Sequence, residues 1–315
     1  MKKILKIFAN KFLNRIQSIV DNSLHETENR LKLNYKKGVI ELKNQHSQEI
    51  QNLTKNYYNL IKKLNKTELL PRLEETGFKV YSQFEEDGLL LYIFTMVGVT
   101  NKKVIEICAA DGKECMASNL IINHGWNGLL FDGDEQNIQT GKDFFKANPS
   151  TFLIPPKFVQ AWITKENINE LIFKNQFNGE IDLLSLDIDG NDYWILKAII
   201  VCSPRVIICE THDIIPSELS LTMPYNPKFQ YHDLPEDVKD YRSVSLLAMT
   251  KLCKEKGYRL IGSHKYGFNV IFMRNDVGVD FFPEVSIESV HNNPWTIYGQ
   301  KDRWEKVKHL NWEEV

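Results

Sequence analysis

The arrangement of hydrophobic and polar residues changes near residue 78. Before that point, apolar residues recur at intervals of three and four, no proline occurs before Pro71, and Gly38 is the single glycine of residues 1–70. This spacing places apolar side chains on one face of a helix. After residue 78, short apolar runs rich in β-branched residues alternate with segments of helical periodicity. The chain is therefore expected to contain a helical part followed by an α/β part.

The second pattern predicts a largely parallel sheet with helices on both faces. We expect strands at residues 104–109, 128–131, 158–162, 181–186 and 205–209, and helices at 118–124, 168–175, 192–201 and 243–256. Two further runs, at residues 258–262 and 268–274, are separated by a short loop and predict a terminal antiparallel hairpin. The expected fold is thus α/β, with seven strands and one antiparallel strand at or near an edge.

Residues 1–70 are expected to form a basic helical or coiled-coil-like extension, and residues 71–315 the main domain. Within the extension, two apolar stripes have helical spacing: Ile50, Leu53, Tyr57, Leu60 and Leu64, and Ile4, Phe8, Phe12, Ile16 and Val20. Lysines and an arginine flank the second stripe, so residues 1–24 could lie on an anionic membrane surface. The alternative, which we favour, is that these helices pack on the main domain or on another copy of the chain. We expect a homo-oligomer, which packing on another copy would produce.

Composition and charge exclude several classes of protein. Hydrophobic residues make up 43% of the chain and charged residues 25%, which is ordinary for a globular protein and excludes collagen and disordered chains. Residues 1–70 contain 14 basic and 6 acidic residues, whereas residues 71–315 contain 25 and 35. No aromatic and basic platform accompanies the basic segment, so we expect no nucleic-acid partner.

The cysteines and the N-terminus indicate a cytoplasmic protein. Five cysteines occur without a CxxC pair, mostly inside apolar segments, as expected of reduced and buried thiols. Lysines interrupt the first apolar residues, which is not typical of a cleaved signal peptide. We therefore expect a cytoplasmic location, at the membrane periphery if the first stripe binds lipid.

Acidic residues follow the first two expected strands, at the edge of the sheet where ligands of α/β folds bind. The end of the first strand contains Glu106 and is followed by Gly112, six residues after Glu106, with Cys108 where a first glycine would be usual in a cofactor-binding turn. Asp132 follows the second strand, 20 residues after Gly112, and is suited to bind both hydroxyls of a ribose. Asp134 is the alternative residue for the ribose contact. The simplest interpretation of Asp132 or Asp134 is an ordinary carboxylate in a turn, without a ligand.

A second polar group follows the fourth and fifth strands. Asp187 ends the fourth strand, and Glu210 and His212 end the fifth, so the three should lie close together. They could hold a divalent ion such as Mg²⁺, Mn²⁺ or Fe²⁺. Alternatively, His212 acts as a metal-free general base that a carboxylate orients. A polar rim of the sheet without a function is the third interpretation.

Taken together, these segments resemble the FkbM-type S-adenosylmethionine-dependent methyltransferases. The resemblance rests on the order and spacing of YSQFEEDGLLLYIF (81–94), VIEICAADGKECMASNL (104–120), GWNGLLFDGD (125–134), LLSLDIDGNDYWILKAI (183–199), PRVIICETH (204–212) and KGYRLIGSHKYGFNVIFMRNDV (256–277). It implies a class I methyltransferase fold, which is a Rossmann-like, seven-stranded and mostly parallel sheet with a terminal antiparallel hairpin. It also implies S-adenosylmethionine as cofactor and methyl transfer to oxygen.

The resemblance implies roles for individual positions. Around the cofactor these are Glu106, Ala109, Asp111 and Gly112 at its methionine part, Ser118 and Asn119 at its charged ends, Asp132 at the ribose, Ala161 and Trp162 at the adenine, and Gln83 as a cover. Related sugar O-methyltransferases hold a metal with carboxylates after strands four and five, which matches Asp187 and Glu210. His212 lies where a further ligand would be convenient, and Asp213 could substitute for it.

The expected function is O-methylation of a sugar hydroxyl. We favour a nucleotide-linked sugar or heptose of a bacterial surface glycan such as capsule as the acceptor. An aromatic segment, residues 222–240, lies where acceptor lids are inserted, and Tyr225, Phe229, Tyr231 and His232 could contact a sugar. The alternatives are a non-catalytic methyltransferase-like scaffold and an NAD-dependent sugar dehydrogenase. The latter is disfavoured because the first turn lacks G-x-G-x-x-G.

Overall fold

The computed structural model describes residues 2–315, except for the side chains of residues 2–17, 19, 20, 33 and 35–46. Contacts within the chain divide it into two units, Met1–Leu53 and Thr54–Val315. The first unit consists of most of α1 (Lys2–Lys63), a helix without interruption. The second unit contains the last turns of α1 and all other elements, so its boundary lies before the expected boundary at residue 70.

The last turns of α1 pack against the rest of the second unit, to which they belong, through a face that the periodicity did not predict. Ile61 is buried, the Tyr58 ring lies 4.9 Å from the Tyr92 ring, and Lys62 Nζ donates a hydrogen bond to the Met96 carbonyl. The predicted stripe, by contrast, is at least half exposed at all five of its positions, which are Ile50, Leu53, Tyr57, Leu60 and Leu64. The stripe that begins at Ile4 lies outside the described side chains. Self-association through either stripe stays a prediction.

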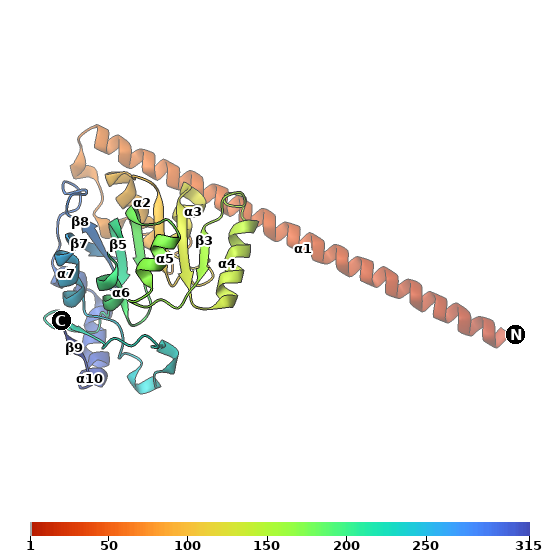
Figure 1. The fold of residues 1–315 in the computed structure, drawn as a ribbon. Helices are drawn as coiled ribbons and strands as arrows, with labels where there is room; N and C mark the ends of the chain where they lie inside the picture. The colour runs from red at the N-terminus through yellow and green to blue at the C-terminus, as the bar shows by residue number, and fades with distance from the viewer. Residues whose placement is uncertain (1) are drawn as a thin grey trace. The chain divides into compact units, whose positions relative to one another are not determined.

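Seven strands form one sheet in the order β3-β2-β1-β4-β5-β8-β7 (Figure 1). They are β1 (Lys103–Ile107), β2 (Asn127–Asp132), β3 (Lys157–Gln160), β4 (Gly179–Leu186), β5 (Cys202–Glu210), β7 (Tyr258–Ser263) and β8 (Asn269–Arg274). Strands β1 to β5 pair in parallel, and β8 lies antiparallel between β5 and β7. This arrangement confirms the predicted fold class, including the terminal hairpin.

Three helices cover each face of the sheet. One face packs on α2 (Glu86–Val97), α3 (Ser118–His124) and α4 (Glu135–Ala147), and the other on α5 (Ile168–Lys174), α6 (Asp192–Ala198) and α7 (Leu246–Glu255). Along β1, Val104 belongs to the first core and Ile105 to the second. Successive strand residues point to opposite faces, so a sheet covered on both sides needs a continuous apolar run. The expected strands were recognisable for that reason.

Two of the helices that cover the sheet were not predicted. Helix α2 is apolar nearly all round and buried from Glu86 to Met96, so it lacks the polar face that marks an amphipathic helix. Helix α4 buries only Ile138, Gly141 and Phe145. The expected helices at the other positions are present, with ends that differ by a few residues. Helix α7, for example, begins after Ser245, whose side chain accepts a hydrogen bond from the Ala248 N–H.

The residues after β8 form a small subdomain that was not predicted. It contains α8 (Ile287–His291), α9 (Pro294–Tyr298), the π-helix η5 (Gly299–Arg303) and α10 (Trp304–Val307), and β9 (Glu313–Glu314) pairs with β6 (Leu221–Thr222). A third apolar cluster joins it to the segment that follows β5, through Ile214, Ile215, Trp304 and Val307. Short 3₁₀-helices complete the chain: η1 (Thr67–Leu69), η2 (Leu73–Glu75), η3 (Tyr231–Asp233) and η4 (Glu236–Val238).

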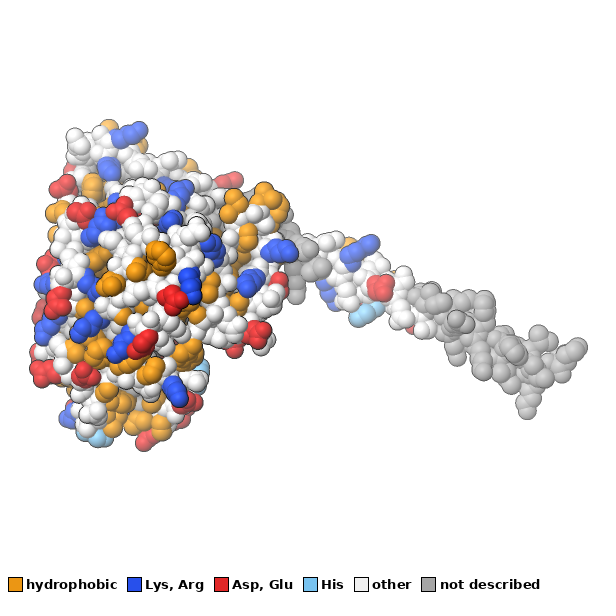
Figure 2. All heavy atoms as spheres, in the orientation of Figure 1, with side chains coloured by type: hydrophobic (Ala, Val, Ile, Leu, Met, Phe, Trp, Pro, Cys, Tyr) orange, Lys and Arg blue, Asp and Glu red, His pale blue; other side chains and the backbone are white. Residues whose placement is uncertain are grey.

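Figure 2 shows acidic and basic side chains interspersed with apolar ones on the visible face of the second unit. Within the described part of the chain, no helix has both the length and the apolar composition needed to cross a membrane.

Gly112→Ala should destabilise the protein more than Gly125→Ala does. Both glycines have positive φ, so either substitution costs about 1 kcal/mol through the backbone. A Cβ at Gly125 would meet nothing within 4 Å, whereas one at Gly112 would lie 2.7 Å from Phe145 and 2.9 Å from Phe158. We expect overpacking to add about 1–3 kcal/mol for Gly112→Ala, measured by urea unfolding. Equal losses for the two variants would contradict this packing.

Candidate active site

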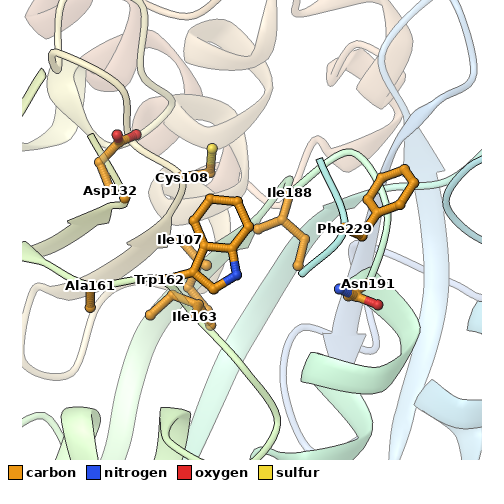
Figure 3. A pocket seen from close by; sticks show the side chains of 10 residues that line it. Ile107, Cys108, Asp132, Ala161, Trp162, Ile163, Ile188, Asn191 and Phe229 are labelled. Atoms are coloured by element: carbon orange, nitrogen blue, oxygen red, sulfur yellow. The ribbon is translucent and has the colours of Figure 1, made fainter. Parts of the chain in front are cut away.

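A cavity opens at the carboxyl ends of β1 and β2 and beside the loops after β3 and β4. Its empty volume, which includes space open to solvent, is about 480 Å³. Its lining consists of Ile107, Cys108, Asp132, Gly133, Ala161, Trp162, Ile163, Ile188, Asn191 and Phe229. In Figure 3 the Trp162 ring lies at the centre of this lining, with Asp132 on one side, Phe229 and Asn191 on the other, and Cys108 above the ring. The walls are mostly apolar, with one carboxylate.

The turn after β1 borders the cavity through Cys108. Cys108 and Ala110 have positive φ, 69° and 46°, so the chain makes a left-handed turn although Cys108 occupies the position where the family pattern has glycine. The turn is tied to β2, since the Ala109 N–H donates a hydrogen bond to the Phe131 carbonyl. Cys108 is exposed, but the surrounding protein atoms and nearby carboxylates still raise the pKa of its thiol, so it stays protonated at neutral pH. Cys108 is therefore a neutral wall of the cavity.

Glu106 lies beneath this turn and not in the cavity. Its carboxylate accepts hydrogen bonds from the N–H groups of Met116 and Ala117, at 2.9 and 2.6 Å, and from the Cys115 thiol. Burial is the main reason that its pKa rises to about 7. Glu106 thus holds the start of α3 against β1, and its expected contact with a cofactor would be indirect.

The other residues expected around the methionine part also lie outside the cavity lining. Ser118 Oγ donates a hydrogen bond to the Gly112 carbonyl at 2.6 Å, and Asn119 Oδ1 accepts one from Asn123. Both side chains are fully buried. Asp111 forms an ion pair with Lys113 on the outer side of the turn. These contacts shape the turn and the first residues of α3.

The two carboxylates after β2 have different surroundings. Asp132 lines the cavity, and its two oxygens accept hydrogen bonds from the N–H groups of Ala110 and Asp134 and from the Asn137 amide. Asp134 is the N-cap of α4 and accepts a hydrogen bond from the Asn137 N–H. Asp134 does not line the cavity, so Asp132 is the better placed of the two for a ribose.

Trp162 and the segment after β6 cover the cavity. Trp162 Nε1 donates a hydrogen bond to the Pro227 carbonyl at 2.7 Å, and the Asn191 side chain exchanges two hydrogen bonds with the Asn226 backbone. Phe229 packs on the Gly190 backbone, where a Cβ would lie 2.4 Å from its ring. Ala161 and Trp162, which we expected to contact adenine, thus line the cavity, and Phe229 lines it as well.

The remaining residues that we expected in the acceptor lid lie elsewhere. The Tyr225 hydroxyl donates to Glu166 at 2.6 Å, the Tyr231 ring lies against Arg242, and His232 is exposed. Gln83 is also exposed and does not line the cavity. Its loop is held by Asp87, whose carboxylate accepts hydrogen bonds from three successive N–H groups, those of residues 80, 81 and 82.

A carboxylate cluster lies beside the cavity, at the ends of β4 and β5. Asp187, Asp189 and Glu210 each bring an oxygen to within 4.8 Å of the others, and Asp187 is hydrogen-bonded to Glu210. Burial and the neighbouring carboxylates raise the pKa of Glu210 well above its usual range. Burial also raises the pKa of Asp187, although the positive charge of Arg242 opposes this effect. Asp187 and Glu210 meet as predicted, and Asp189 joins them.

His212 does not belong to this cluster, so the expected grouping of His212 with Asp187 and Glu210 is wrong. The chain turns after β5 so that the His212 N–H donates to the Val244 carbonyl, and Nε2 bonds the Asp240 carbonyl at 2.8 Å. Burial lowers its pKa to about 4, so the ring is neutral and already hydrogen-bonded. Asp213, the suggested substitute, lies beside Gly299 of the C-terminal subdomain instead.

Residues 114–260 match the family model described as the methyltransferase FkbM domain. These residues form a methyltransferase FkbM domain. The family prediction is thereby confirmed for the part of the chain that contains Asp132, Asp187 and Glu210. The first turn, with Glu106 and Cys108, lies just before the matched residues. None of the curated proteins searched matches the chain significantly.

Solved methyltransferases are similar to the chain at low identity. The N-terminal domain of EvdMO1 with SAH bound is 14% identical, with 69% of this chain and 95% of that chain covered and a TM-score of 0.42. An S-adenosylmethionine-dependent methyltransferase from Clostridium acetobutylicum is 10% identical, with coverages of 70% and 98% and a TM-score of 0.39. Magnesium protoporphyrin IX methyltransferase (ChlM) from Synechocystis is 12% identical, with coverages of 60% and 77% and a TM-score of 0.36.

Glu106→Gln should reduce the loss of stability that the FkbM-domain protein undergoes as pH rises from about 4.5 to 7. The folded protein holds the Glu106 proton up to about pH 7, whereas the unfolded chain releases it near pH 4.5. The stabilisation from this proton is therefore complete below pH 4.5 and is lost as pH rises through 7. Glutamine does not titrate, so the free energy of unfolding should fall less steeply.

Urea unfolding at several pH values measures this slope. Asp87, Asp192 and Asp213 also have raised pKa values, of about 6 to 7, so part of the slope should remain. The exposed Glu218→Gln variant serves as the matched control and should keep the wild-type slope. A Glu106→Gln slope equal to that of the control would show that Glu106 does not hold this proton.

Proposed function

We propose that the chain transfers a methyl group from S-adenosylmethionine to the hydroxyl of a sugar. The observation that carries this proposal is the direct continuity between the cavity and the carboxylate cluster. Ile188 lines the cavity, and its two neighbours in the chain, Asp187 and Asp189, belong to the cluster. A cofactor in the cavity would therefore present its reactive end beside groups that can accept a proton.

The cavity lining suits the adenosine part of this cofactor. Ala161, Trp162, Ile188 and Phe229 offer apolar and aromatic surface for a purine. Asp132 offers one acceptor position to a ribose hydroxyl, because an ionised carboxylate has about four such positions and three are in use. The methionine part would extend along the Cys108 turn towards Asp187, with Glu106, Ser118 and Asn119 holding that turn in shape.

S-adenosylmethionine, when bound, supplies a methyl group on a positively charged sulfonium. In the transfer, the bond from sulfur to methyl breaks as the bond from the acceptor oxygen to methyl forms, and the hydroxyl proton must leave. Asp187 is the group that we assign to receive this proton. Its raised pKa makes it a better base for a hydroxyl than an ordinary aspartate. Its position at the end of β4 also favours the cofactor's positive charge.

A hydroxyl group could bind the polar atoms of the cluster that lack a hydrogen-bond partner within the described residues. Glu210 Oε2 and Arg242 Nε are buried and have no hydrogen-bond partner within the described residues. One is an acceptor and the other is a donor, and a hydroxyl can satisfy both because it donates and accepts. A neutral sugar, which presents several hydroxyls, is therefore our preferred acceptor. The family resemblance supports a nucleotide-linked sugar or heptose of a surface glycan such as capsule, in the cytoplasm.

Asp132→Asn should weaken SAH binding about tenfold, which corresponds to about 1.4 kcal/mol for charge-assisted hydrogen bonds to the ribose. The matched control is Asp134→Asn, two residues away. Asparagine caps a helix as well as aspartate does, so this variant should keep both stability and SAH affinity. Calorimetric titration measures both affinities. Weaker binding in Asp134→Asn alone would show that the two carboxylates have been assigned in the wrong order.

Asp187→Asn should lower the rate of methyl transfer at least 100-fold, since positioned general bases contribute about 10²–10⁴-fold. Its affinity for SAH should stay within a few-fold of the wild type, because the amide is the same size as the carboxylate. Single-turnover rates with saturating cofactor give the comparison. A rate near that of the wild type would exclude Asp187 as the proton acceptor.

Mass spectrometry of reaction mixtures tests the function itself. The full-length protein is incubated with S-adenosylmethionine and a panel of nucleotide-linked sugars and heptoses, and products heavier by one methylene are sought. We expect one acceptor class to gain this mass, with SAH released in equal amount. SAH binding without turnover on any acceptor would favour the non-catalytic scaffold, and product formed only from non-sugar hydroxyl compounds would refute the sugar assignment.

A further inference from the structure

The family resemblance leads one to expect a divalent metal at the carboxylate cluster, and the donor set alone would suit one. Asp187, Asp189 and Glu210 supply oxygen ligands of the kind that Mg²⁺ and Mn²⁺ prefer. The structure, however, puts a side-chain cation there. We infer that Arg242 is the resident cation of this cluster and takes the place of a divalent ion.

Arg242 interacts with every member of the cluster. One guanidinium nitrogen forms an ion pair with Asp189, and the other lies 4.0 Å from Glu210 Oε1. Its charge also acts on Asp187, the third member. A planar guanidinium with five N–H donors can serve several carboxylates at once. The position that a metal would need to reach all three oxygens is thus next to this positive charge.

The surroundings of Arg242 hold it at the cluster. Its side chain is only 17% exposed, and its guanidinium carbon lies 4.6 Å from the centre of the Tyr231 ring. Ser243 has a positive φ of 58°, its carbonyl accepts the Met223 N–H, and its hydroxyl donates to Asp192. The backbone beside Arg242 is therefore fixed. The other nearby cation, Arg303, is paired with Asp240.

The Arg242 guanidinium compensates part of the negative charge of the cluster without a metal, through its ion pair with Asp189 and its approach to Glu210. A divalent ion would add two positive charges beside Arg242, and like charges a few ångströms apart repel strongly in a buried site. Metal binding would therefore require Arg242 to leave the cluster.

The consequence for catalysis, which rests on the proposed methyl transfer, is a metal-independent reaction. In that reaction Arg242 acts as a positioning residue that holds Asp189 and Glu210. Turnover of the wild-type protein should be the same with and without EDTA. Loss of turnover in EDTA that Mn²⁺ restores would overturn the inference.

Binding of Mn²⁺ tests the inference without any methyl acceptor. The probe is Mn²⁺ alone, and the measurement is the electron paramagnetic resonance signal of the free aqueous ion, titrated with the full-length protein. We expect no specific binding to the wild type or to Arg242→Lys, which keeps the positive charge. Arg242→Met removes the charge at similar size and should bind Mn²⁺ at least tenfold more tightly. A second change, Asp187→Asn in the Arg242→Met background, should abolish that gain.

The outcomes separate this inference from the proposed function. If the wild-type protein binds Mn²⁺ and the Asp187→Asn variant does not, the inference is overturned even if methyl transfer is confirmed. The inference is also overturned if Arg242→Met folds but binds Mn²⁺ no more tightly than the wild type, because the arginine would then not occupy a cation position. Thermal melting checks the fold, and Arg242→Gln replaces Arg242→Met if the latter does not fold. A gain in Mn²⁺ affinity supports the inference even if no acceptor is found.

Discussion

The parallel register of β4 and β5 is the constraint on which the candidate active site depends. Leu186 pairs with Cys209, so the next residues, Asp187 and Glu210, emerge side by side at the carboxyl ends of neighbouring strands. Two partly buried carboxylates this close together cannot both be ionised without a cost in free energy. The raised pKa of Glu210 and the positive charge of Arg242 offset this cost, and the cluster can persist next to an apolar cavity.

The strand ends of this site could be predicted from sequence because they follow from local patterns. Apolar runs located the strands, and the acidic residues after them located Asp132, Asp187 and Glu210, because all parallel strands end at the same edge of the sheet. His212 was misplaced for a physical reason. It lies two residues beyond the strand, where the chain has already turned to bond Val244 and Asp240. Register reasoning applies only while the backbone stays extended.

Sequence reasoning missed Arg242 and named Phe229 only as an acceptor contact. Both residues belong to the long connection from β6 to α7, whose path depends on tertiary contacts such as the Trp162–Pro227 hydrogen bond. No local pattern in the sequence shows where this connection runs. The role of Glu106 was missed differently: its position at the first turn was noted, but its carboxylate holds backbone N–H groups of the following segment. A buried acid near a cofactor turn can thus act through the backbone.

A crystal structure of the protein with SAH tests the central claim most directly, namely that the cavity and the carboxylate cluster together form one cofactor and acceptor site. The account predicts adenosine between Trp162 and Phe229, a ribose hydroxyl on Asp132, and the sulfur directed towards Asp187. SAH bound elsewhere, or with its sulfur directed away from the ends of β4 and β5, would contradict it.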